Sequence, residues 1–255
     1  MYELILSEWE RIFARKKTIV SLLIYIVLLG LLAFGLHRGG IGFYTPEMYT
    51  QLNSLNFPVF LLKEVGFLLS FIILPMLFVD SFNGEYRSGA FRMVLIRPQP
   101  IMKLLLAKWV AMVSVVLVLL TITFLLGQII GWLFFPTATN VSFYPDGESF
   151  SLWGSFGYSF LFYLLFFGIY LAYLGIASLI STVAPNAILS FFLTVATLLA
   201  MIYAPDQLRF FLRTGEEAFK IMNGSGKTEF LLMLFTVIFV TYSLGIRLWC
   251  RKDWI

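Results

Sequence analysis

Residues 104–135 have the sequence LLLAKWVAMVSVVLVLLTITFLLGQIIGWLFF, in which Lys108 is the one charged side chain. The hydrocarbon core of a bilayer is about 30 Å thick, and an α-helix crosses it with about 20 apolar residues. A run this long and this apolar predicts a transmembrane helix that tilts or extends into the water on either side. The segment therefore points to an integral membrane protein before any motif is considered.

The composition of the whole chain leads to the same class. Of its 255 residues, 60% are hydrophobic and 13% are charged, whereas a soluble domain averages about 45–50% apolar and about 25% charged residues. A soluble fold of this size must present its outer faces to water and cannot hide so much apolar surface. A bilayer removes that limit, because lipid accepts apolar side chains on the outside as well.

Apolar runs recur along the chain, and most are long enough to cross a bilayer. Continuous runs favour helices, because the strands of a membrane barrel are about 10 residues of alternating polarity. About 17 mixed residues precede the first run, so we do not expect a cleavable signal peptide. We predict an all-α integral membrane protein with a single transmembrane domain, residues 1–255. Its six transmembrane helices are expected at residues 18–36, 58–80, 104–135, 152–182, 187–204 and 230–246.

The basic residues predict the orientation of these spans. An even number of spans places both termini on one side, and twelve of the eighteen Lys and Arg residues fall in segments on that side. Five fall on the opposite side, and Lys63 lies within a span. Because cytoplasmic loops carry an excess of Lys and Arg, we expect both the N-terminus and the C-terminus in the cytoplasm.

Residues 1–17 precede the first span and have helical apolar spacing. Trp9, Ile12 and Phe13 share one face with the apolar residues before them, while Glu3, Glu10 and other polar residues fall elsewhere. This pattern predicts an amphipathic helix that lies in the inner membrane interface, with Trp9 anchored at the level of the headgroups.

Residues 205–229 form a predicted extracellular amphipathic segment between the last two spans. A small or apolar face recurs at helical spacing, and the segment then breaks at glycines. The residues of that face are Leu208, Phe211, Leu212, Gly215 and Phe219. Gly224 to Thr228, GSGKT, matches the end of a phosphate-binding loop, but the pattern requires glycine where Ile221 lies. A turn before the last span is the favoured interpretation.

Residues 81–103 form the largest predicted cytoplasmic loop. An apolar cluster at residues 91–96 follows mixed charges, and Arg97-Pro98 ends it, since a proline disfavours helix at the preceding residue. We expect a short helix that lies across the inner membrane face. The loop is either a solvated basic segment that obeys the positive-inside rule or a docking surface for a cytoplasmic partner.

This part of the chain combines the spacing Glu85-x-x-x-Gly89, the apolar run that follows, Arg97-Pro98, and Lys108 at the start of a long span. In these features it resembles the permease subunits of type-2 ABC exporters. The order of elements along nearly the whole chain resembles them too, most closely the small bacterial permeases that export peptides, antibiotics or lipid-like compounds. One departure is Ala90, where the family commonly has threonine after the motif glycine.

The resemblance implies a mechanism and partners. A separate ATPase would bind beneath the permease and drive it through a coupling helix in the loop, with Trp9 and its face forming a connecting helix. The implied coupling residues are Glu85, Arg87, Gly89, Arg92, Arg97 and Pro98. ATP and Mg²⁺ would be held by that ATPase, and no cofactor, metal site or catalytic residue is expected on this chain. Further implied partners are a second copy or a homologous permease and membrane lipid, in a bacterial cell membrane, without nucleic acid.

Other residues leave alternatives open. Lys63 and Glu64, within the second predicted span, are either a gate or substrate site or an outer-interface pair, and we favour the interface. The segment Trp153 to Gly157, WGSFG, suggests an intramembrane serine hydrolase, but such chemistry needs a base and the chain has one histidine, His37. We favour close helix packing there. An intramembrane hydrolase or transferase and a non-transporting membrane assembly protein remain the alternative functional classes.

Overall fold

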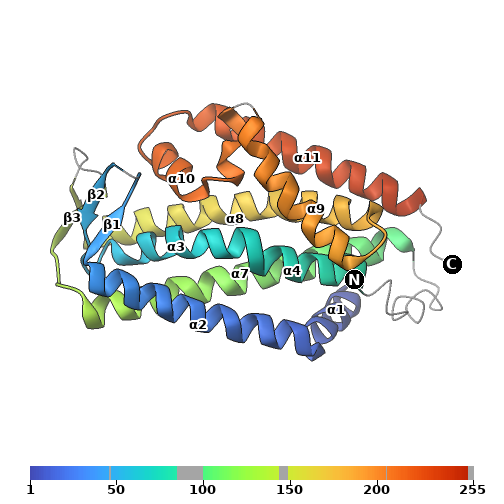
Figure 1. Cartoon of the computed structure of the whole chain (residues 1–255), viewed down its shortest axis with the longest axis horizontal. Helices are drawn as coiled ribbons and strands as arrows, with labels where there is room; N and C mark the ends of the chain where they lie inside the picture. The colour runs from blue at the N-terminus through green and yellow to red at the C-terminus, as the bar shows by residue number, and fades with distance from the viewer. Residues whose placement is uncertain (46, 85–99, 144–148, 205, 252–255) are drawn as a thin grey trace.

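The computed structural model describes residues 1–45, 47–84, 100–143, 149–204 and 206–251. Within these residues, five helices are long and apolar enough to cross a membrane, and they run side by side along the long axis of the molecule (Figure 1). These helices are α2 (Lys16–Gly39), the continuous helix Phe57–Gly84, α7 (Ile101–Phe134), α8 (Leu152–Val183) and α11 (Lys227–Arg251). The architecture is that of an all-α, multi-pass membrane protein.

The predicted fifth span is the shortest of the apolar helices. Residues 187–204 were expected to cross the bilayer, and the structure forms α9 (Ala187–Ala200) followed by the 3₁₀ turn η3 (Met201–Tyr203). At 1.5 Å per α-helical residue and about 2 Å per 3₁₀ residue, this helix is about 27 Å long, just short of a bilayer core of about 30 Å. The prediction of six spans is therefore supported for the five long helices, and α9 falls slightly below the required length.

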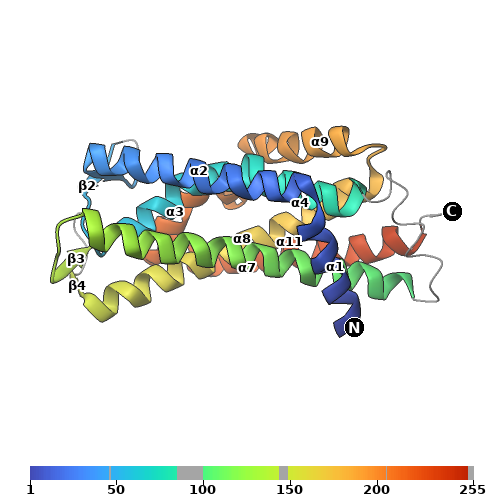
Figure 2. The same ribbon diagram turned by 90° about the horizontal axis from the view of Figure 1, so that it is seen from below.

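The ends of the bundle differ in structure (Figure 1). At one end lie α1 (Tyr2–Ala14) and the end of α11, and Figure 2 shows α1 crossing the long helices steeply. The opposite end carries antiparallel hairpins made of β1 (Ile41–Phe43) with β2 (Tyr49–Gln51) and of β3 (Asn140–Ser142) with β4 (Ser149–Ser151). The Ser54 N–H donates to the Pro136 carbonyl at 3.0 Å, which ties the two loop regions together.

The second span has an irregular backbone. It consists of α3 (Phe57–Leu68), the π-helical turn η1 (Leu69–Ile73), α4 (Leu74–Val79) and a second π-helical turn, η2 (Asp80–Gly84). In η1 the Leu74 N–H bonds the Leu69 carbonyl, five residues back. Pro75 has no N–H with which to continue this pattern to the Ser70 carbonyl. That carbonyl accepts the Tyr173 hydroxyl of α8 at 2.6 Å instead.

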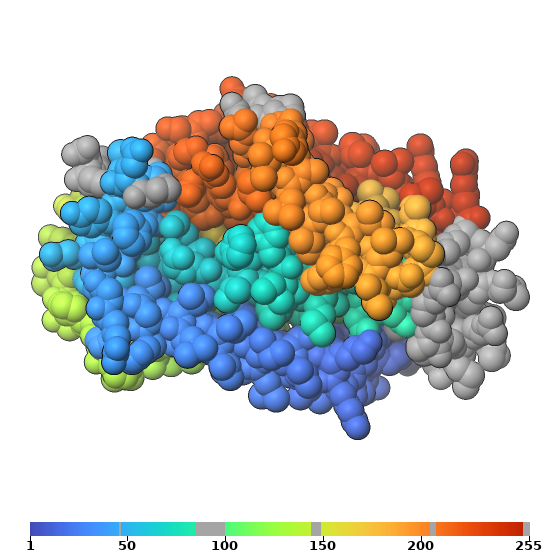
Figure 3. Space-filling model, in the orientation of Figure 1, coloured from blue at the N-terminus to red at the C-terminus, as the bar shows by residue number. Residues whose placement is uncertain are grey.

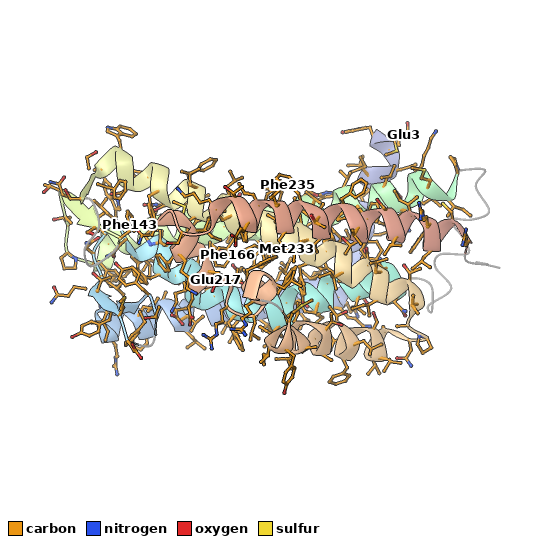
Figure 4. All side chains as sticks on the ribbon, turned by 90° about the horizontal axis from the view of Figure 1, so that it is seen from above. Glu3, Phe143, Phe166, Glu217, Met233 and Phe235 are labelled. Atoms are coloured by element: carbon orange, nitrogen blue, oxygen red, sulfur yellow. The ribbon has the colours of Figure 1, made fainter. Side chains whose placement is uncertain are left out.

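This irregular helix is the centre of the bundle. Its residues Phe57, Phe60 and Leu62 are completely buried, and Tyr163 of α8 donates to the Pro58 carbonyl at 3.0 Å. The peripheral helices α2, α9 and α11 instead expose apolar faces that lipid would cover. Phe235 of α11 lies at the surface, whereas Phe166 of α8 is buried between helices (Figure 4).

The segment between α9 and α11 folds back onto the bundle. It forms the 3₁₀ turn η4 (Asp206–Phe211) and α10 (Thr214–Met222), which packs on α3 and α8. Phe219 is completely buried, with its ring centroid 5.3 Å from that of Phe60 and 4.8 Å from that of Phe162. The apolar face expected from the sequence is therefore the packed face of this segment.

Glycines allow α7 to approach the second span closely. A Cβ atom on Gly131 would lie 2.9 Å from the Ser54 carbonyl oxygen, and one on Gly127 would lie 3.1 Å from the Pro58 Cα. Gly35 of α2 differs, because a Cβ atom there would meet nothing within 4 Å. Small residues let membrane helices pack at short distance, so the α7 glycines have a structural role that Gly35 lacks.

We predict that Gly131→Ala destabilises the protein by about 1–3 kcal/mol, because the added methyl group overlaps backbone that cannot move freely. The matched Gly35→Ala variant is expected to leave stability unchanged or to raise it by up to about 1 kcal/mol through helix propensity. The measurement is the temperature at which the detergent-solubilised protein loses its monodisperse peak. Equal effects of the two substitutions would contradict the proposed packing.

Candidate functional site

The six residues implied in coupling, Glu85, Arg87, Gly89, Arg92, Arg97 and Pro98, lie outside the residues that the structure describes. The structure does describe the base of their loop, where η2 ends and α7 begins. Here charged and polar side chains from several helices meet η2, and we call this group the polar junction. Its members are Glu8, Arg15, Asp80, Ser81, Asn83 and Lys108.

A buried ion pair lies at the centre of the polar junction. The Lys108 Nζ lies 3.2 Å from the Glu8 Oε2, and each side chain is only 1% exposed. Lys108 also donates to the Ser81 carbonyl at 3.1 Å, and Glu8 pairs with Arg11 one turn further along α1. Because an unpaired charge is very costly to bury, these contacts hold α1, α7 and η2 together.

Asp80 of the second span binds Arg15, the residue that connects α1 to α2. The Arg15 Nη1 donates to the Asp80 Oδ2 at 2.9 Å and to its carbonyl at 3.2 Å. The Lys17 Nζ lies 3.6 Å from the other carboxylate oxygen. Arg15 separates α1 from α2 in an extended conformation, so this pairing sets the direction in which α1 leaves the first span.

Asn83 joins η2 to the turn between α8 and α9. Its amide donates to the Ser181 carbonyl at 3.0 Å and to the Ala184 carbonyl at 2.9 Å, and the side chain is buried. Carbonyls at a helix end need such partners, because they have none within the helix. The Ser181 and Ser190 hydroxyls, 2.9 Å apart, connect the same two helices. A displacement of η2 would therefore act on every element that these contacts join to it, namely α1, α2, α7, α8 and α9.

The helix predicted at residues 1–17 forms as α1, and its apolar side chains fall into a group packed against the bundle and a group exposed at the surface. The Trp9 Nε1 donates to the Ser114 Oγ of α7 at 2.6 Å, Ile12 is buried, and the Trp9 and Phe13 ring centroids are 4.9 Å apart. Tyr2 and Leu6 are exposed instead. Trp9, expected at the headgroups, is half-buried against α7, which leaves Tyr2 and Leu6 as the side chains open to lipid.

Lys63 and Glu64 lie beneath α10, where the Lys63 side chain is 14% exposed and that of Glu64 is 37% exposed. The Lys63 Nζ lies 3.1 Å from the Glu64 Oε1, and the Lys63 stem packs so closely on Gly215 that a Cβ atom there would overlap it. Arg213 and Glu216, with 3.6 Å between Nη1 and Oε2, border the same cavity of about 270 Å³. We call this cavity the outer pocket; it brings charges of the second span and α10 together.

The other motifs singled out in the sequence lie at the start of α8 and before α11. The Ser155 Oγ donates to the Ser151 carbonyl at 2.9 Å in the first turn of α8. The close helix packing expected at WGSFG is not seen at its glycines, because a Cβ atom on Gly157 would meet nothing within 4 Å and one on Gly154 would lie 3.3 Å from Phe150 of the adjoining β4. Gly224 and Gly226 have φ angles of 93° and 68° in the turn before α11. Among the described residues, no group of three or more His, Cys, Asp or Glu side chains could hold a metal ion.

Sequence reasoning missed Glu8, Asp80 and Asn83 as site residues. Glu8 carried a signal, because Ile5, Glu8 and Ile12 are spaced at three and four residues and so share one helical face. An acid within an apolar face predicts a basic partner, and Lys108 is the one charge in the run at 104–135. Neither a protein-family model nor the sequence of a curated protein matches the chain.

We predict that Lys108→Met destabilises the protein by about 3–5 kcal/mol, because the Glu8 carboxylate loses its buried cation and is left with the partly exposed Arg11. The double variant Glu8→Gln with Lys108→Met removes both charges and is expected to recover most of the loss. Lys103→Met, on the exposed face of the same helix, is the control. Thermal unfolding in detergent measures all three. A double variant no more stable than Lys108→Met would contradict the pairing.

For the outer pocket we expect a much smaller effect. Lys63→Met should cost at most about 1 kcal/mol, because Glu64 is 37% exposed and keeps its contact with solvent. The same unfolding assay compares it with Lys108→Met. A loss as large as that of Lys108→Met would mean that the outer pair is held away from water, contrary to the geometry.

Proposed function

We propose that the chain is the transmembrane subunit of an ATP-driven exporter of the type-2 ABC kind, energised by a separate ATPase. The observation that carries the proposal is the polar junction at the base of the loop with the Glu85-x-x-x-Gly89 motif. A loop that only obeyed the positive-inside rule would not require a buried clamp to several helices at its base. A loop that transmits force would require one.

The contacts of the polar junction suit such a transmission. A push on the loop would act first on η2, which follows directly on α4. The Asn83 amide would pass the displacement to α8 and α9, and the contacts of Asp80 and Ser81 would pass it to α1, α2 and α7. The buried Glu8–Lys108 pair resists separation because neither charge can be left unpaired, so α1, α7 and η2 would move together.

The irregular second span supports the same function. The π-helical turn η1 and Pro75 interrupt the regular hydrogen-bond ladder between α3 and α4. Helices bend at π-turns and at prolines, and π-turns inside helices are frequent at functional sites. A bend here would let the half of the span that carries η2 move while α3 stays packed against α7.

The cargo and assembly follow from the same proposal. The cargo is a peptide, antibiotic or lipid-like compound, and the chain acts in the cell membrane of a bacterium with both termini in the cytoplasm. Two permeases, identical or homologous, enclose the pathway, since the apolar faces of α2, α9 and α11 are open to a neighbour or to lipid. The outer pocket lies along the second span from Lys63 to Phe71, between the middle of that helix and the end away from the polar junction, and cargo would leave toward that end.

Co-purification tests the proposal. The tagged chain is isolated from its native host, and an ATPase with an ATP-binding cassette is expected to co-purify and to hydrolyse ATP. Glu85→Ala should reduce the recovered ATPase roughly tenfold or more, as expected when one side of an interfacial charge pair is removed. Glu47→Ala, an exposed acid in the hairpin region at the other end, is the matched control.

The possible outcomes separate the alternatives. No cassette ATPase in the purified complex would contradict the exporter proposal and favour a membrane assembly protein. Equal recovery from Glu85→Ala and Glu47→Ala would retain the exporter and reject the motif as its coupling element.

A further inference from the structure

A trough opens on the surface of the bundle between α2 and α9, with α4 and η2 as its floor. Its volume is about 380 Å³. Lys17 and Asp80 form its rim, and its walls are Met76, Val79, Ala187, Ile188 and Phe191. Figure 3 shows this face, where α9 lies over α4 and the beginning of α2 borders them.

The trough is graded in polarity along the direction of the spans. Lys17 and Ala187 lie within the first two residues of α2 and α9, and Asp80 lies one turn before the last residue of the helix Phe57–Gly84, so the rim is close to the ends of these helices. Met76 and Phe191 lie one turn further in, where the Ser21 Oγ donates to the Met76 Sδ at 3.4 Å. The charged rim therefore lies at headgroup level and the apolar walls face the hydrocarbon.

The rim presents the cation Lys17 to an anion. The Lys17 side chain is 74% exposed, and its contact with Asp80 is loose at 3.6 Å. The Asp80 carboxylate is paired with Arg15 at 2.9 Å, so the Lys17 ammonium is open to a second negative group. Basic residues at a membrane surface attract anionic lipids.

We propose that the trough binds one anionic phospholipid, with its phosphate at Lys17 and the upper part of an acyl chain along Met76, Val79 and Phe191. A lipid has the same order of charge and apolar surface as the trough. A peptide strand fits less well, because apolar side chains give its backbone no hydrogen-bond partners. The site requires only that the helices cross a membrane, so it does not depend on the proposed transport function.

Native mass spectrometry of the full chain tests the site. The detergent-solubilised protein is titrated with dioleoylphosphatidylglycerol and, separately, with dioleoylphosphatidylcholine. The first phosphatidylglycerol is expected to bind about fivefold more tightly, the effect of one basic residue beside an anionic headgroup, and Lys17→Ala should remove that preference. Lys16→Ala, the same change one residue away, should keep it.

A second variant tests the apolar walls. Ala187→Phe fills the trough and should weaken the binding of both lipids, whereas Leu193→Phe, on the exposed face of α9 outside the trough, should weaken neither. Equal losses from Lys16→Ala and Lys17→Ala would overturn the site in favour of general attraction to a basic segment. If Ala187→Phe separates dimers into monomers and leaves lipid binding unchanged, a second copy of the chain covers the trough and the lipid proposal is wrong.

Discussion

The carboxylate of Glu8 and the ammonium of Lys108 are removed from water together, and each needs the other to be tolerated in the interior. This constraint explains why α1, which could lie loosely in the membrane interface, is fastened to α7 and to the end of the second span. It also explains why η2 has a defined position, since the Ser81 carbonyl completes the environment of Lys108. The loop that follows η2 therefore starts from a fixed base.

The irregular backbone of the second span imposes a second constraint on the packing of the helices. Its π-helical turns and Pro75 leave backbone carbonyls that an ordinary helix would satisfy internally, and lipid offers such groups no partner. Tyr163 and Tyr173 of α8 supply hydroxyl donors to the second span. The abundance of aromatic residues in α8 is thus explained in part by hydrogen bonding to a neighbouring helix. An irregular, bendable helix is kept stable because it lies in the centre and not at the lipid surface.

The apolar runs predicted the long helices to within a few residues, because the bilayer thickness imposes a length that composition reveals directly. Prolines and glycines marked their ends, as at Phe135 before Pro136 and at the left-handed Gly40 after α2. The run at 187–204 was less informative, since its length was close to the minimum that crosses a bilayer. The packing of α10 over Lys63 had no signal in the sequence beyond the apolar face of the segment.

The sequence by itself determined the membrane class, the positions of the long helices and the amphipathic character of α1, because each depends on local composition and helical spacing. The tertiary structure alone decided which polar groups meet. Glu8 and Lys108 are 100 residues apart in the chain, and Tyr173 is 103 residues from Ser70. Their energies depend on burial and on distances of about 3 Å, which arise only when separate helices pack. For the same reason the polar junction, the outer pocket and the trough could be found only in the folded molecule.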